Sequence, residues 1–207
     1  MDVIWYGRSC FFIKGSELSV LADPVNEGGG LIAGLPTADV ATFSQGLLDQ
    51  PLPPIKPRRR IIRSPGEFEV AGAFVHGAKA FRDRDRGAQR GPTIVFTYVL
   101  DGVHVCHLGG IGHVPTTEQA SAIGAVDVLL VPVGPEALDS EQASDVVAAL
   151  EPKAIIPFHT GTAADREVLA KLLKNLSLPQ SGPLPKLAVT RSSNEPQRIV
   201  LLEPAKG

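Results

Sequence analysis

Hydrophobic and polar positions alternate in short runs over the first half of the chain and change rhythm in the second half. Short alternating runs span Asp2–Tyr6, Cys10–Lys14 and Glu17–Ala22, and glycines lie in the turns between them. This pattern is typical of an antiparallel meander. We expect further strands over 38–43, 58–63, 67–70 and 73–79.

A strong hairpin signal precedes the change of rhythm. The apolar runs Thr93–Leu100 and Val103–Leu108 are separated only by Asp101 and Gly102. A D-G pair between two such runs predicts a tight β-turn.

After residue 115 the pattern predicts helices alternating with strands. Thr116 with Gln119, and Asp139 with Gln142, have the spacing of capping boxes. They predict helices over 116–123 and 139–150, and the apolar period predicts a third over 164–176. Continuous apolar runs over 126–133 and 154–158 predict strands buried on both faces, and strands over 186–190 and 198–202 follow. A sandwich with the sheets inside and helices on both outer faces buries these elements.

Composition limits the classes of partner. The 207 residues carry a formal net charge of −2, with 43% hydrophobic and 20% charged residues, and no long apolar segment. We expect one globular domain over 1–207, located in the cytoplasm, with neither nucleic acid nor membrane as a partner. Cys10 and Cys106 lie in apolar runs, so buried free thiols are favoured over a disulfide.

One basic segment stands out against this background. Lys56–Arg63 carries five basic residues, which is compatible with an anion-binding patch or with a solvated edge strand. The negative net charge favours the edge strand, because charges there prevent edge-to-edge pairing.

The stretch Val103–His113 joins the two halves of the chain. It reads V-H-V-C-H-L-G-G-I-G-H, a strand that ends in a glycine turn with three histidines. Many α/β enzymes place their chemistry at such a turn. The alternative is a turn whose histidines only form structural hydrogen bonds.

Six local motifs, in order along the chain, resemble the metallo-β-lactamase superfamily. They read W-Y-G-R-S-C-F-F-I (5–13), L-A-D-P (21–24), G-E-F-E-V-A-G (66–72), H-L-G-G-I-G-H (107–113), V-D-V-L-L-V-P-V-G (126–134) and I-I-P-F-H-T (155–160). Within that superfamily the chain is most similar to small bacterial metal-dependent hydrolases. The resemblance implies an α/β (α+β) fold, a four-layer αββα sandwich.

The resemblance also implies a two-metal hydrolytic site, built from a His-x-His-x-Asp-His loop, two later histidines and a bridging carboxylate. In this sequence most of those positions differ. The residues at the family's metal-site positions are Gln45, Leu47, Asp49, Gln50, Arg82, Gly110 and His159, and Arg8 replaces the histidine of an early G-H-S motif.

These replacements predict that the dinuclear site is absent. Leucine cannot ligate a metal, glutamine is a poor zinc ligand, and arginine places a positive charge where a dication would bind. We therefore expect no metal cofactor and a non-catalytic, regulatory or ligand-binding protein. A pocket that also includes His107 and His113 would suit an anionic small molecule.

Two alternatives remain open. A shifted mononuclear site built from Asp49, His159 and His107 could hold one Zn, Mn or Fe ion and hydrolyse an ester, lactone or phosphodiester. A structural subunit that pairs with an active homologue is the second, and a homo-oligomer is compatible with either.

Overall fold

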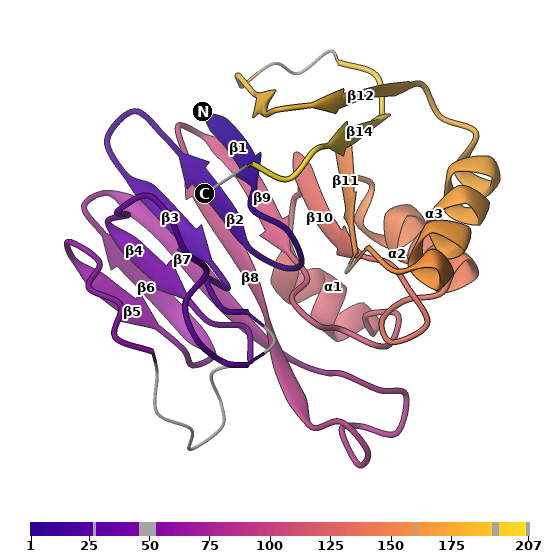
Figure 1. Ribbon diagram of the computed structural model, residues 1–207, viewed down its shortest axis with the longest axis horizontal. Coiled ribbons are helices and arrows are strands. Elements are labelled where there is room, and N and C mark those ends of the chain that lie inside the picture. Colours follow the sequence, from indigo (N-terminus) through magenta and orange to yellow (C-terminus); the bar gives the residue numbers. More distant parts are fainter. Residues whose placement is uncertain (27, 46–52, 160, 192–194, 206–207) are drawn as a thin grey trace.

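The computed structural model describes residues 1–26, 28–45, 53–159, 161–191 and 195–205 (Figure 1). Within these ranges the chain forms two stacked sheets and three helices. The smaller sheet has the order β13 (Leu187–Ala188), β1 (Asp2–Trp5), β2 (Phe11–Lys14), β3 (Ser19–Ala22), β4 (Val40–Thr42) and β5 (Arg60–Ile62). The larger has the order β12 (Gln180–Leu184), β14 (Arg198–Leu202), β11 (Ala154–Phe158), β10 (Val128–Pro132), β9 (Val103–His107), β8 (Pro92–Leu100), β7 (Ala73–Phe81) and β6 (Gly66–Val70).

The change of rhythm in the sequence corresponds to a change in strand pairing. Strands β6 to β9 pair antiparallel, whereas β9, β10, β11 and β14 pair parallel. The predicted meander of β1, β2 and β3 is confirmed, and β5 is an edge strand, as its basic residues suggested. The mixed α/β class with two packed sheets is therefore as predicted.

Two apolar layers follow from the alternation of side chains along the larger sheet. On β10, Val128 and Leu130 pack between the sheets, whereas Leu129 and Val131 pack beneath the helices. The helices are α1 (Thr117–Ile123), α2 (Ser140–Leu150) and α3 (Ala163–Leu176), and all three cover this same face (Figure 1). The predicted capping boxes of α1 and α2 are both present.

The outer face of the smaller sheet departs from the prediction of helices on both sides. Its apolar residues, including Cys10, Phe12 and Leu21, pack against Ile32, Leu35 and Ile55 from loops. In the described part of the chain no helix covers this face. The proline-rich segment near Ile55 cannot form helical hydrogen bonds, so loops provide the cover.

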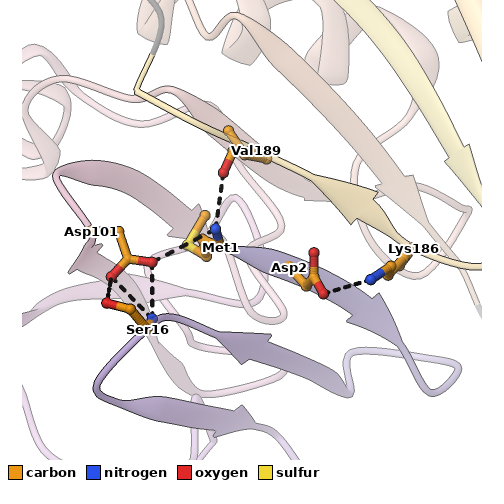
Figure 2. Close-up of polar contacts among 6 residues, drawn as sticks. All are labelled: Met1, Asp2, Ser16, Asp101, Lys186 and Val189. Atoms are coloured by element: carbon orange, nitrogen blue, oxygen red, sulfur yellow. Dashed lines mark hydrogen bonds and ion pairs between the residues drawn. The ribbon is translucent and has the colours of Figure 1, made fainter.

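A polar cluster joins turns of the two sheets at the ends of their strands (Figure 2). Asp101, in the β8–β9 turn, accepts hydrogen bonds from the Ser16 backbone N–H (3.0 Å) and hydroxyl (2.7 Å). The Met1 amino group lies 3.6 Å from the same carboxylate and donates to the Val189 carbonyl at 3.0 Å. These bonds hold the pKa of Asp101 below its ordinary value. The cluster fixes the β8–β9 hairpin against the smaller sheet.

The two cysteines are free and lie in separate apolar clusters. Burial raises the pKa of both thiols, that of Cys106 to about 12. The prediction of buried free thiols is confirmed. Among the described helices, none has the length and apolar character that crossing a membrane requires.

Candidate functional site

A cavity of about 440 Å³ opens where β10 and β11 end, beside the glycine turn that follows β9. Loops after parallel strands commonly form such sites, because the strands' carboxyl ends share one sheet edge. Five residues that the sequence proposed line it, namely Arg8, Gln45, Arg82, Gly110 and His159. Its lining also includes Arg90, Glu136, Thr162 and Asp165, which no motif in the sequence marks.

The glycine turn is held by close packing. Gly109 has φ +58°, and a Cβ there would lie 2.6 Å from the Ser44 Cβ. A Cβ at Gly112 would lie 2.1 Å from the Arg82 carbonyl oxygen. Both positions therefore require glycine, because any side chain would displace a neighbouring segment.

Gly110 differs from the glycines on either side of it. Its φ lies outside the left-handed region, and an added Cβ would make only ordinary contacts. That Cβ would lie 3.5 Å from both Arg82 Nε and Gln45 Nε2. A guanidinium and an amide thus surround the position where the family resemblance places a bridging carboxylate.

Arg82 follows β7 and is partly buried. One of its terminal nitrogens donates to the Arg90 carbonyl at 3.4 Å, whereas its Nε is buried with no hydrogen-bond partner among the described residues. Burial lowers the pKa of Arg82, and the neighbouring Arg90 charge lowers it further. The guanidinium remains charged, because arginine does not lose its proton in proteins.

The loop that carries Arg82 is shaped by the next residue, Asp83. Its carboxylate accepts hydrogen bonds from the backbone N–H groups of Asp85, Gly87, Gln89 and Arg90. Burial opposes ionisation of Asp83, but these four donors outweigh it and lower the pKa. Arg90 at the far end of the loop pairs with Glu136 at 3.3 Å, which links the loop to the segment after β10.

His159 follows β11 on another wall of the cavity. Its ring lies edge-on to Trp5, with 5.7 Å between ring centroids, and its Nδ1 is buried without a hydrogen-bond partner among the described residues. Partial burial lowers the pKa of His159 and outweighs the opposing charge of Asp165. The imidazole is therefore neutral at pH 7. Asp165 belongs to the capping box of α3, with Thr162 as the N-cap.

The two other histidines expected at the pocket do not line it. His107 is fully buried between the sheets, where its Nε2 donates to the Ser9 carbonyl at 3.0 Å and its ring stacks on Phe158. The Nε2 of His113 accepts from the Phe81 N–H, so its Nδ1 carries the proton and donates to the Val114 carbonyl at 2.8 Å. Both imidazoles make structural hydrogen bonds, which was the alternative reading of this stretch.

The described residues do not fit the family's metal site. No group of three His, Cys, Asp or Glu side chains in the described ranges could hold a metal ion. His107 uses Nε2 as a donor, so that nitrogen cannot ligate, and Arg82 opposes a cation beside Gly110. Leu47, Asp49 and Gln50 lie outside the described residues, so the expectation of no metal remains a prediction.

The parallel-strand rule could have found the missed residues. Glu136 follows β10, whereas Thr162 and Asp165 follow β11, so the rule that ligands bind at the carboxyl ends of strands points to both loops. Arg90 gave no such signal, because its place depends on how the Asp83 carboxylate folds its loop.

The chain resembles known proteins along most of its length. A UPF0173 protein from Pyrococcus abyssi is 26% identical, covering 78% of this chain and 84% of its own length. The structure of a candidate Zn-dependent hydrolase of the metallo-β-lactamase superfamily from Thermotoga maritima matches with a TM-score of 0.76 and 29% identity, covering 97% of this chain and 98% of its own. That of a candidate metal-dependent hydrolase from Parabacteroides distasonis matches with a TM-score of 0.64 and 17% identity, covering 84% and 88%, and shows the fold alone.

The family model described as a beta-lactamase superfamily domain matches residues 2–159, which include every motif quoted above except the last residue of the sixth. The relatives include an archaeal protein, so the similarity extends beyond small bacterial hydrolases. With its two stacked sheets and the cavity at the strand ends, this chain belongs to the metallo-β-lactamase superfamily.

Proposed function

We propose that this protein is a metallo-β-lactamase-fold pseudoenzyme that binds an anionic small molecule without a metal. The observation that carries the proposal is the pair of donors beside Gly110. Arg82 and Gln45 place a guanidinium and an amide around the position where the family's catalytic centre would have a carboxylate. A site that has a guanidinium in place of a carboxylate favours anionic ligands over metal cations.

The electrostatics of the cavity support this proposal. Three arginines, Arg8, Arg82 and Arg90, line it together with two carboxylates, Glu136 and Asp165. The Arg82 Nε–H is buried without a partner among the described residues, and a buried donor that makes no hydrogen bond costs on the order of 1–3 kcal/mol. An anionic oxygen from a ligand would offset part of that cost, and the cavity has the volume of a metabolite site.

Thermal unfolding with a panel of phosphorylated and carboxylated metabolites tests the proposal. A ligand at about one hundred times its dissociation constant stabilises by about 2.7 kcal/mol, which raises the Tm of a chain of this size by roughly 5–10 °C. Arg82→Gln should abolish that shift. Arg84→Gln is the matched control, because Arg84 pairs with Asp139 on the surface at 2.8 Å and does not line the cavity.

Metal analysis of protein purified without a chelator separates this function from hydrolysis. The Thermotoga and Parabacteroides proteins are described as candidate metal-dependent hydrolases, and the same activity is the alternative here. We expect no stoichiometric Zn, Mn or Fe and no turnover of esters, lactones or phosphodiesters. Stoichiometric metal with turnover would favour the shifted mononuclear site, and no stabilisation by any anion would remove the binding proposal.

A further inference from the structure

The missing side chain at Gly110 has no structural cause in the turn itself. Gly109 and Gly112 are excluded from substitution by contacts of 2.6 and 2.1 Å, whereas a Cβ at Gly110 meets no described atom closer than 3.5 Å. The Gly110 N–H lies 3.4 Å from the Thr93 hydroxyl, which fixes the backbone here. Gly110 therefore leaves a space that the fold does not need, directly beside the two donors.

Two donor nitrogens from different side chains lie beside this space. Arg82 Nε and Gln45 Nε2 lie at equal distances of 3.5 Å from the Cβ position of Gly110. Among the described residues, the Arg90 carbonyl is the only hydrogen-bond partner of the Arg82 guanidinium, at 3.4 Å. A carboxylate has two oxygens in one plane and accepts from two such N–H groups at once.

The charge on this wall matches a monoanion. The cavity lining has three arginines and two carboxylates, and Arg90 is already paired with Glu136 at 3.3 Å, so one positive charge is in excess. A phosphate dianion would leave one negative charge unbalanced near Glu136. Beyond the donors, Pro132, Val133 and Phe158 give the cavity an apolar part.

We infer that the ligand is a carboxylic acid with an apolar body, and that its carboxylate occupies the space beside Gly110, between Arg82 and Gln45. This inference rests on the proposed anion-binding function and names the chemical class of the ligand.

Three small probes test the class of ligand, namely benzoate, its neutral isostere benzamide, and phenyl phosphate. At about ten times its dissociation constant, benzoate should raise Tm by roughly 3–6 °C, whereas benzamide at the same concentration should leave Tm unchanged. Phenyl phosphate should bind at least tenfold more weakly than benzoate. Arg82→Gln should remove the benzoate shift, and Arg84→Gln should retain it.

A carboxylate placed on the protein itself tests the location. Gly110→Asp should raise Tm of the ligand-free protein above that of Gly110→Asn, which has the same shape without the charge. It should also abolish benzoate binding, because the subsite is then filled internally. High salt should reduce the Tm difference between the two variants.

The outcomes distinguish failure of the carboxylate inference from failure of the anion-binding function. If phenyl phosphate stabilises the protein in an Arg82-dependent way and benzoate does not, anion binding stands and the carboxylate inference is overturned. The inference also fails if Gly110→Asp is less stable than Gly110→Asn, or if it binds benzoate as well as the unsubstituted protein does. If no anion in the panel or among the probes binds, both proposals fail together.

Discussion

The loop after β7 and the cavity wall beside it differ in how fully their buried polar groups are hydrogen-bonded. Asp83 is a buried carboxylate whose oxygens accept four backbone hydrogen bonds within its own loop. Arg82, one residue earlier, has a buried Nε with no partner in the described part of the chain. The carboxylate of Asp83 therefore has several hydrogen-bond partners, whereas the guanidinium of the adjacent Arg82 keeps one buried N–H without a described partner.

The histidines of the chain differ in whether they line the cavity. His107 and His113 each use a ring nitrogen as a donor to a backbone carbonyl, and both lie outside the cavity. His159 lines the cavity and has a buried Nδ1 without a partner in the described ranges. Buried polar groups in folded proteins are nearly always hydrogen-bonded, so the exceptions call for an explanation. Among the described residues there are three such side-chain atoms. Arg82 Nε and His159 Nδ1 belong to residues of a single cavity, whereas His107 Nδ1 lies between the sheets.

The largest expected effect separates the glycines of the turn. Gly112→Ala should lower the free energy of unfolding by about 3 kcal/mol, because its Cβ would overlap the Arg82 carbonyl. Gly110→Ala should change it by less than about 1 kcal/mol, since its Cβ makes only ordinary contacts. Urea unfolding of the two variants measures the difference. Equal destabilisation would mean that packing also requires a glycine at position 110. The contrast between Gly110 and the structural glycines of the turn would then be wrong.

The next effect is a pH dependence that originates at His107, outside the cavity. Full burial holds the pKa of His107 below its ordinary 6.5, outweighing the charge of Asp23 and the bond to Ser9. As pH falls below 6.5, the unfolded chain takes up a proton here that the folded chain does not. The free energy of unfolding therefore falls, by up to about 1.4 kcal/mol per pH unit for this one group.

Urea unfolding at pH 7.5 and pH 5.5 measures this slope. His107→Gln keeps an N–H donor for the Ser9 carbonyl and removes the ionisation, so its slope should be smaller by about 1 kcal/mol over the interval. His159→Gln is the comparison, because His159 is only partly buried and its removal should change the slope less. Equal changes from the two variants would contradict a distinction between interior and cavity histidines.

Much of the fold could be predicted from local signals. The D-G turn forms, with both Asp101 and Gly102 at positive φ, and the helices with capping boxes begin where those boxes placed them. Strand β12 was missed because Gln180–Leu184 contains glycine and proline, which are tolerated at the edge of a sheet. The absence of helical cover on the smaller sheet, in the described ranges, was missed because loop packing leaves no periodic pattern.

The site was predictable only where a family motif marked a position. Arg8, Gln45, Arg82, Gly110 and His159 do converge on the cavity, although they come from distant parts of the sequence. His107 was misplaced because a sequence does not show that its ring nitrogen bonds to Ser9, 98 positions away. Whether a neighbouring group satisfies a polar atom is a property of the folded structure.

The smallest expected effect lies at the boundary between the two regions, where Glu136 pairs with Arg90. The pair is exposed on the Glu136 side, so Glu136→Gln should change the free energy of unfolding by less than about 0.5 kcal/mol. The Arg90 bond to the Glu136 backbone carbonyl is unaffected by this substitution.

Anion affinity should respond more than stability to the same substitution. Glu136→Gln leaves the Arg90 charge uncompensated beside Arg82, so the anion should bind about threefold more tightly at low salt, and the gain should shrink as salt rises. Isothermal titration at two salt concentrations measures this. Glu167→Gln is the matched control, because it breaks an exposed pair with Lys171 on α3, outside the cavity, and should leave affinity unchanged. Weaker binding in Glu136→Gln would show that the pair with Arg90 maintains the shape of the cavity. Arg90 would then have a structural role and no direct role in attracting the anion.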